Sequence, residues 1–323
     1  MAKTKVATVQ SLKRTGFEKF CHDFARNWQL HLMIELPIAY KIIFHYITLL
    51  HLKTAFQDFN PNLGIMNSEW IGLYNMVHFF SNPEWSQLVI NTLVLSLYTI
   101  AVGFPIPIIL ALVIHVNTYG ALKKIAQNVS YIPHFISVVI LVGIINTVLH
   151  PIYGIPSTIS DLLGREYFRD FRFTEETFRH LYVWSGVWQG MGWSSIIYVS
   201  ALSAVPDDLH EAAKLDGASR LRRVWSVDLP TILPTIAIML IMRFGSIMSV
   251  GYQKAYLMWS NDNKDVSELI STYVYKKGLK NPDGAEYSYG TSVGLMNSVV
   301  NTSMTVLVNW ITNVLTDNEM GLF

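Results

Sequence analysis

The sequence predicts an all-α membrane protein with six transmembrane helices, and three observations support this fold class. First, 51% of the 323 residues are hydrophobic and only 15% are charged, whereas an average soluble domain has about 25% charged residues. Second, the mean hydropathy is +0.31. Third, several apolar stretches reach the length of about 20 residues that a helix needs to cross a bilayer. We therefore expect lipid to replace water around much of this chain.

Six stretches meet this length requirement. They cover approximately residues 30–50, 85–116, 129–149, 181–205, 232–259 and 289–315. Pro105 and Pro107 should bend the second stretch, because proline removes a helix hydrogen bond. The fourth stretch contains Gly186, Gly190 and Gly192, whose spacing is typical of close contact between membrane helices. The intervening segments are rich in Gly, Pro, Asn and charged residues.

The basic residues predict the orientation of the chain, because cytoplasmic loops carry an excess of Lys and Arg. With the N-terminus inside, twelve Lys and Arg residues fall on the cytoplasmic side and nine on the outer side, where acidic residues accompany them. We therefore expect both termini to be cytoplasmic. Segments 150–180 and 260–288 should face outward as small structured caps.

Segment 206–230 is a polar insertion between the fourth and fifth stretches, on the predicted cytoplasmic side. It reads as two short helices. Asp207 favours the positive end of a helix dipole, Gly217 suits a left-handed residue at a helix end, and Ser219 can cap the second helix. That helix should stop before Pro230. A polar hairpin with no core of its own is best explained as a docking element for a cytoplasmic partner.

One spacing within this segment is long and specific. It consists of Glu-Ala-Ala, three residues, Gly, nine residues, an aliphatic residue, one residue and Leu-Pro, and it is formed by Glu211, Ala212, Ala213, Gly217, Val227, Leu229 and Pro230. The pattern resembles the signature of permease subunits of binding-protein-dependent ABC importers. The resemblance covers nearly the whole chain and is closest to the carbohydrate branch, among the lipoprotein-linked and pectin-fragment permeases related to the maltose type. Further similar stretches are residues 55–61, 91–93, 131–137, 188–194, 216–219 and 320–323.

This resemblance implies a type I ABC importer permease fold, a location in the bacterial cytoplasmic membrane, and a set of partners. These are a second homologous permease subunit, two ATP-binding subunits and an extracytoplasmic solute-binding protein. In the family, helices of the loop dock on the ATPase and couple its closure to the membrane helices. The residues implied to couple here are Glu211, Ala212, Ala213, Gly217 and Arg220.

The chain itself is expected to be non-catalytic. It has no Gly-rich phosphate loop, so ATP and Mg²⁺ should be bound by the separate ATPase subunits. Its single cysteine, Cys21, excludes an intrachain disulfide and a cysteine metal cluster. The histidines at 134, 150 and 180 lack metal-ligand spacing, and we expect no metal site and no cofactor. The net charge of +1 gives no support for nucleic-acid binding.

The predicted organisation has four parts. They are a basic cytoplasmic tail (1–28), a first transmembrane helix with its outward loop (29–84), a five-helix importer domain that includes the coupling loop (85–316), and a short cytoplasmic C-terminal tail (317–323).

Two basic residues are candidates for the transport pathway, because an ionisable side chain at membrane depth is costly and usually functional. Arg243, on the fifth stretch, could contact a substrate or pair across the bundle, or it could reach the cytoplasmic interface. Lys254 lies near the outer end of the same stretch and could meet an entering substrate or only snorkel.

Other pathway candidates have the chemistry that binds sugars, namely aromatic faces, amides and hydroxyls. They are Trp188, Gln189, Trp193, Tyr198, Tyr252, Gln253, Asn297 and Asn301. The alternative for the aromatic residues is membrane-interface belts or packing. The resemblance suggests an oligosaccharide or polysaccharide substrate, acidic if it comes from pectin or alginate. The basic residues of the outward segments fit anionic sugars and an ordinary salt-bridged surface equally well.

Two other classes of function would leave different patterns in the sequence. An ion-driven secondary transporter would show inverted repeats with broken helices and membrane acids at matching positions. A membrane-embedded enzyme would need paired carboxylates or His and Asp ligands at matched depth. The sequence shows neither arrangement.

Overall fold

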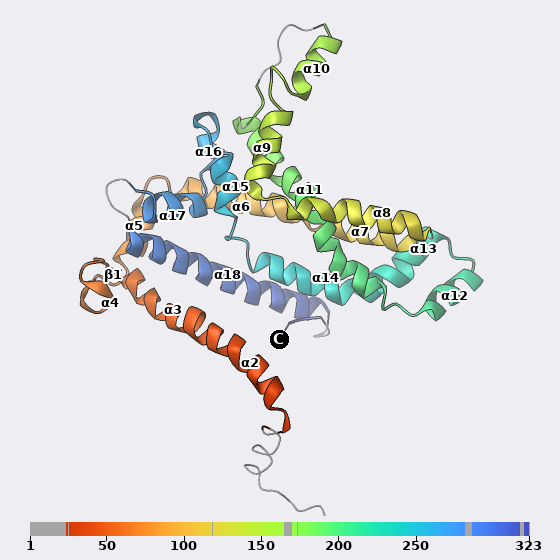
Figure 1. The fold of residues 1–323 in the computed structure, drawn as a ribbon, viewed down its shortest axis with the longest axis horizontal. Coiled ribbons are helices and arrows are strands. Elements are labelled where there is room, and N and C mark those ends of the chain that lie inside the picture. Colours follow the sequence, from red (N-terminus) through yellow and green to blue (C-terminus); the bar gives the residue numbers. More distant parts are fainter. Residues whose placement is uncertain are drawn as a thin grey trace, which may run out of the picture. The chain divides into compact units, whose positions relative to one another are not determined.

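The computed structural model describes residues 24, 26–117, 119–164, 170–172, 174–281, 286–316 and 320–322. Nearly all of the predicted N-terminal tail, including Cys21, and most of the C-terminal tail lie outside these ranges. The chain divides into two compact units, residues 1–53 and 54–323. The described elements are helices and one two-stranded hairpin (Figure 1).

The first unit is a helical rod. It consists of α2 (Trp28–Lys41), a π-turn η1 (Ile42–Tyr46), α3 (Ile47–Leu49) and the start of a 3-10 segment η2 (Leu50–Phe56). Pro37 lies inside α2. Proline cannot donate the backbone hydrogen bond to the carbonyl four residues earlier, which here is that of Met33.

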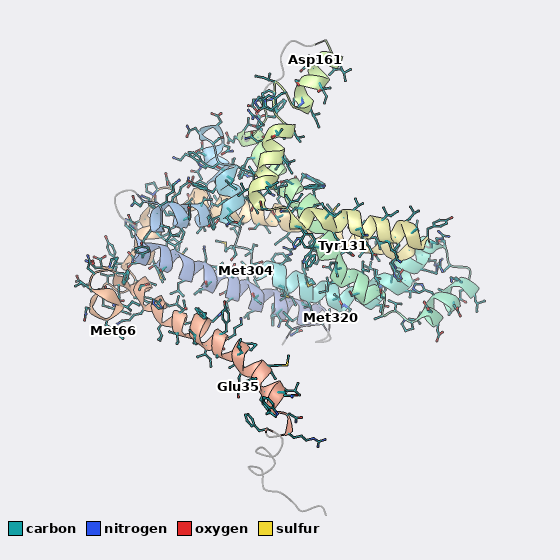
Figure 2. The ribbon with its side chains drawn as sticks, in the orientation of Figure 1. Glu35, Met66, Tyr131, Asp161, Met304 and Met320 are labelled. Carbon is teal, nitrogen blue, oxygen red and sulfur yellow. The ribbon has the colours of Figure 1, made fainter. Side chains whose placement is uncertain are left out.

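Most side chains of this rod are apolar, and nearly all of them are exposed. No residue of α2 is buried, and Glu35 is the acidic side chain that projects from the middle of it (Figure 2). Exposed apolar residues on all faces are typical of a helix surrounded by lipid. The exposed set includes Leu30, Leu32, Met33, Ile34, Leu36, Ile38, Ile42, Ile43 and Phe44.

The second unit begins with short elements. Strand β1 (Gln57–Asp58) pairs antiparallel with β2 (Glu69–Trp70), with α4 (Gly64–Asn67) between them and α5 (Tyr74–Ser81) after them. The hairpin is attached to the C-terminal helix, because the backbone N–H of Phe59 donates to Ser288 Oγ at 2.8 Å.

The second predicted stretch forms α6 (Trp85–Gly103) and α7 (Pro105–Val116), which meet at Phe104. Pro105 occupies the first position of α7. Proline is favoured there because an N–H at the first position of a helix has no acceptor within the helix, so its absence costs no hydrogen bond.

The third predicted stretch, residues 129–149, is not one straight span. The chain forms α8 (Gly120–Tyr131), a 3-10 turn η3 (Ile132–Phe135) and α9 (Val138–Val148). The helix that ends in η3 and α9 are bent by 101° relative to one another. Tyr131, labelled in Figure 2, is the last residue of α8.

Local chemistry explains this bend. Pro133 lies in the first turn of η3 and disfavours a continuous helix through the preceding residue. Ser137 has extended backbone angles and caps α9 by accepting from the N–H of Ile140 at 3.3 Å. A capping serine is a start signal for a new helix, so the apolar run contains two helices.

Helix α11 (Glu175–Leu202) is the central element of the second unit. It packs against α6, α7, α8 and α14. Before it, α10 (Ile155–Leu162) projects away from the long helices on the segment predicted to face outward (Figure 1).

Segment 206–230 contains α12 (Asp207–Leu215), α13 (Arg220–Arg223) and a π-turn η4 (Val224–Asp228) that leads into α14 (Leu229–Phe244). The expectation that the second helix stops before Pro230 is wrong: α13, η4 and α14 form one continuous helix of 25 residues. Pro230 is accepted because it follows a widened π-turn, where the regular hydrogen-bond ladder is already interrupted.

The fifth predicted stretch, residues 232–259, is also interrupted. Helix α14 ends at Phe244, and α15 (Tyr252–Leu257) begins after an irregular segment. Gly245 and Gly251 flank this segment. The remaining elements are η5 (Asn261–Asn263), α16 (Lys264–Ser267), α17 (Ile270–Gly278) and α18 (Tyr287–Leu315).

Three described helices are long and apolar enough to cross a membrane. They are Trp28–Phe56, Trp85–Val116 and Arg220–Phe244, and the bent pair Gly120–Phe135 with Val138–Val148 is a fourth candidate. Helices α11 and α18 are long enough but carry more polar residues. The number of six spans therefore stays a prediction.

Three clusters of buried apolar side chains hold the second unit together. One joins α6 and α11 to α15 and α16, the second joins α5, α6, α17 and α18, and the third joins α7, α11 and α14. Met304, labelled on α18 in Figure 2, packs at the edge of the second cluster.

Gly192 marks the closest approach within this core. A Cβ atom at this position would overlap the backbone carbonyl of Ser130, the penultimate residue of α8. A Cβ at Gly190, on the same helix, would meet nothing within 4 Å. The crossing of α11 and α8 therefore depends on the glycine at 192.

We expect Gly192→Ala to lower the stability of the detergent-solubilised chain by about 1–3 kcal/mol, the usual cost of overpacking. Gly190→Ala is the matched control and should be neutral or stabilising, because alanine is the better helix former. Thermal unfolding followed by circular dichroism measures both. Equal behaviour of the two variants would contradict the close crossing.

Candidate functional site

The docking hairpin, defined as residues 206–230, begins with a helix whose two ends are stabilised locally. Asp207 and Asp208 lie in the first turn of α12, where the helix dipole favours negative charge. At the other end Gly217 has a φ of 75°. The N–H of Ala218 donates to Ala213 O at 2.9 Å and the N–H of Gly217 to Lys214 O at 3.0 Å. This pair of bonds is a Schellman motif.

The second helix of the hairpin starts as the sequence predicts. Ser219 caps α13, and its Oγ accepts from the N–H of Arg222 at 3.3 Å. The helix then continues through η4, where Thr231 Oγ1 donates to Val227 O at 2.7 Å. This side chain satisfies a carbonyl near the position where Pro230 removes a donor.

The outer surface of the hairpin is open to a partner. Of the predicted coupling residues, Glu211, Ala212, Gly217 and Arg220 are exposed, and Ala213 is half-buried. Large apolar side chains are exposed beside them: Leu215 is 90% exposed, and Leu209, Leu221 and Trp225 are exposed too. Exposed apolar patches of this kind are typical of surfaces that contact a protein partner or a membrane.

Two adjoining cavities lie within the second unit, between α6, α7, α11 and α14. Their volumes are about 230 Å³ and 210 Å³, and both are lined by Thr99, Ile100, Tyr182 and Arg243. Gln189 and Lys254 line the larger one. We call the two together the central cavity. Three of the predicted pathway residues therefore meet in one place.

Lys254 is held at the wall of this cavity. Its side chain is 8% exposed, and its Nζ donates to the backbone carbonyl of Tyr182 at 2.6 Å. The same ammonium lies 4.6 Å from the centre of the Tyr182 ring, within the range of a cation–π contact. Gly186 leaves room for it, because a Cβ there would lie 3.2 Å from Nζ.

Two predicted amides bind backbone groups at helix breaks. Gln189 Nε2 donates to the carbonyl of Ile136 at 2.7 Å, at the break before α9. Asn301 Oδ1 accepts from the N–H of Met248 at 2.9 Å, after the end of α14. Asn297 is half-buried with a buried Oδ1 that has no hydrogen-bond partner.

The predicted aromatic residues lie outside the central cavity. Tyr198 is buried in the third apolar cluster. Trp193 is exposed and stacks on His134, with 4.5 Å between ring centres. Tyr252 stacks on Tyr275 at 4.8 Å. Trp188 and Gln253 are exposed. Their part in a pathway stays a prediction.

Several basic residues of the outward segments have partners in the part of the chain that the structure describes. Arg172 forms an ion pair with Asp170 at 2.7 Å, and its hydrogen bond lowers the pKa of that carboxyl. Lys276 pairs with Glu268 at 2.8 Å. Arg179 donates to Asn91 Oδ1 at 3.0 Å. This arrangement favours the salt-bridged surface over an anion-binding one.

Sequence reasoning missed a cluster formed by His115, His210 and Asp228. His115 lies at the end of α7, His210 on α12 and Asp228 at the end of η4. The two Nε2 atoms lie 3.6 Å and 3.1 Å from Asp228 Oδ1. No spacing in the sequence could reveal the cluster, because its members are far apart in the chain. The one local signal in the sequence was the carboxylate of Asp228, which directly precedes the apolar residues of α14.

Residues 89–315 match the sequence model of a family described as binding-protein-dependent transport system inner membrane component. The chain belongs to this family. It is thus an inner membrane component of a transport system, and the resemblance carried by the docking hairpin is confirmed.

This permease is similar to curated proteins of Bacillus subtilis strain 168. It is 39% identical over 280 residues to the polygalacturonan/rhamnogalacturonan transport system permease protein YteP, over 87% of this chain and 86% of the relative. It is 36% identical over 299 residues to protein LplB, over 92% of each chain.

Solved structures show the same fold. A chain of a bacterial ABC transporter involved in the import of the acidic polysaccharide alginate matches with a TM-score of 0.81 and 32% identity, over 93% of this chain and 100% of that chain. A second structure, the bacterial alginate ABC transporter in complex with alginate pentasaccharide-bound periplasmic protein, matches with a TM-score of 0.80.

The left-handed residue of the docking hairpin provides a graded test. Replacing Gly217 by Ala should destabilise the hairpin by about 1–2 kcal/mol, and Gly217→Asn should cost less because Asn tolerates this conformation. Amide hydrogen exchange in peptides from 207–223 should be slowest in the wild type, faster in Gly217→Asn and fastest in Gly217→Ala. Gly120→Ala is the control, since a Cβ there meets nothing within 4 Å. Faster exchange in the Asn than in the Ala variant would contradict the proposed conformational cause.

Proposed function

We propose that this permease subunit imports an acidic oligosaccharide in an ATP-driven, binding-protein-dependent system. The observation that carries the proposal is the central cavity, where Arg243 and Lys254 bring positive charge beside the amide of Gln189. Arg243 also lines the adjoining cavity. A guanidinium matches a carboxylate in charge and in geometry, and an amide offers both a donor and an acceptor to sugar hydroxyls.

The relatives support a saccharide substrate by what their names state. One transports polygalacturonan and rhamnogalacturonan, and the solved importers act on alginate. These are similar proteins, and their substrates bear on this chain through the shared family and the cationic cavity. A neutral oligosaccharide is the second candidate, because another relative belongs to an arabinooligosaccharide system. The ion-driven alternative has no support, since the family is that of binding-protein-dependent transport.

The proposed unit contains this permease, a second permease, two ATPase subunits and an extracytoplasmic solute-binding protein. Six spans, with both termini in the cytoplasm, would place the docking hairpin inside the cell and α10 and α15–α17 outside. The exposed apolar residues of the hairpin support docking on an ATPase. ATP and Mg²⁺ would bind to the ATPases, and transport would follow from their different affinity for the inward-open and outward-open states.

Docking can be tested by charge reversal on the hairpin. We expect Glu211→Arg to abolish co-purification of the ATPase subunits with the affinity-tagged permease, because it places a bulky cation in the contact surface. The matched control is Asp262→Arg, at an exposed residue on the other predicted side of the membrane. Quantified subunit ratios give the result. An unchanged ratio in Glu211→Arg, with transport maintained, would refute docking through this residue.

Substrate charge can be tested at Arg243. Hydrogen bonds to charged groups contribute about 1.5–3 kcal/mol, so Arg243→Gln should lower uptake of alginate or galacturonate oligosaccharides about tenfold or more. Arg243→Lys should retain part of the activity. Lys124→Gln, at an exposed residue of α8, controls for charge loss.

The measurement is uptake into proteoliposomes that contain the whole complex and its binding protein. If a neutral oligosaccharide is transported instead, with equal rates in all these variants, the acidic substrate is wrong. If no saccharide of either kind is transported by the intact complex, the carbohydrate assignment fails as a whole.

A further inference from the structure

Three potential metal ligands meet where the docking hairpin joins the helix bundle. His115 is the penultimate residue of α7, His210 lies on α12 directly before Glu211, and Asp228 is the last residue of η4. The cluster therefore connects the docking helix to the ends of two long helices. It is separate from the central cavity, whose lining includes none of the three residues.

The donor atoms have separations that suit a transition metal. One nitrogen from each imidazole and one carboxylate oxygen all lie within 4.8 Å of one another. Asp228 Oδ1 lies 3.1 Å from Nε2 of His210 and 3.6 Å from Nε2 of His115. In a tetrahedral zinc site with Zn–N bonds of about 2.0–2.1 Å, neighbouring ligand atoms are about 3.3 Å apart. Small side-chain rotations would complete the site.

The carboxylate is buried and incompletely satisfied. Asp228 is 1% exposed, and its Oδ1 has no hydrogen-bond partner. Nε2 of His210 is likewise buried without one, although the two atoms face each other. Buried charges in proteins are paired or coordinate metals. Among the described residues, the ion-pair partners of Asp228 are the two imidazoles.

A cavity beside the cluster provides access and space. Its volume is about 490 Å³, and Asp207 and Asp228 contribute the acidic part of its lining. A metal site needs an entry path, and three protein ligands leave a fourth tetrahedral position for water. The cavity supplies both.

Basic residues also line this cavity, namely Lys214, Arg220 and Arg223. Lys214 and Arg220 are exposed, so water and salt screen their charges. Arg223 is half-buried, and its Nε is buried without a hydrogen-bond partner. The positive charges of these basic residues disfavour protonation of both imidazoles, just as they disfavour a bound metal ion. A transition metal binds imidazole nitrogen by direct ligation, which these basic neighbours do not prevent.

We propose that His115, His210 and Asp228 bind a divalent transition metal of the zinc class. The ion would be held by two neutral imidazole nitrogens and one carboxylate oxygen, with water as the fourth ligand. It would fix α12 against the ends of α7 and α14, and so restrain the docking hairpin. This metal site goes beyond the importer function and does not depend on the identity of the transported substrate.

Metal binding is tested on the full-length chain in detergent, after equilibration with Zn²⁺ and dialysis. We expect about one zinc per chain by elemental mass spectrometry, and a Co²⁺ complex with the intense visible absorption of four-coordinate cobalt. Loss of even an outer-shell partner of a metal site weakens binding about 10–100-fold. We therefore expect Asp228→Asn and His210→Gln to weaken zinc binding at least tenfold. His78→Gln, at an exposed histidine of α5, is the matched control and should change nothing.

A second variant keeps the proposal falsifiable if these substitutions impair folding. His210→Cys should retain the metal, because a thiolate also binds zinc, and its Co²⁺ complex should gain a thiolate charge-transfer band. Wild-type protein that retains no zinc after dialysis would overturn the proposal and leave a His–Asp ion pair. Zinc binding equal in the wild type and in Asp228→Asn and His210→Gln would also overturn it. Neither result depends on ATPase docking or on transport.

Discussion

The need to satisfy backbone groups where membrane helices break governs the second unit. An unpaired N–H or C=O away from water costs free energy, and irregular backbone at membrane depth is tolerated only inside the protein. Two neighbouring helices supply the partners. Gln189 on α11 donates to Ile136 O beside the break before α9, and Asn301 on α18 accepts from the N–H of Met248 after α14 ends. Polar side chains of α11 and α18 thus support the neighbouring helix breaks.

The same constraint explains the position of the cavity. Broken helices pack less continuously against α11, and the space that results is lined by Gln189, Lys254 and Arg243. Gln189 has a structural partner, and Lys254 donates to Tyr182 O. Substitutions of Gln189 or Lys254 would therefore alter both the local structure and any contact with a substrate. Arg243 is the more informative probe of substrate charge, because it lines both parts of the cavity.

The caps of the hairpin could be predicted from the sequence, and the bend before α9 and the cluster around Asp228 could not. Gly217 and Ser219 act within a few residues of their own position, so their roles in the hairpin follow from residue type. Hydropathy gives the length of an apolar run but not its direction, and so the 101° bend before α9 was missed. The cluster around Asp228 joins residues far apart in sequence, and only the packing of α7 on the hairpin brings them together.

The continuity of α13, η4 and α14 links the hairpin to the cavity mechanically. A helix of 25 residues spans roughly 37 Å at about 1.5 Å per residue, and Arg243 is its penultimate residue. Displacement of the hairpin by a docked ATPase would therefore move Arg243 without an intervening loop. The π-turn that ends at Asp228 interrupts the regular hydrogen-bond ladder of this helix, and Pro234 lies further along it. A metal bound at Asp228 would restrain this turn and would oppose movement of α12 relative to the ends of α7 and α14.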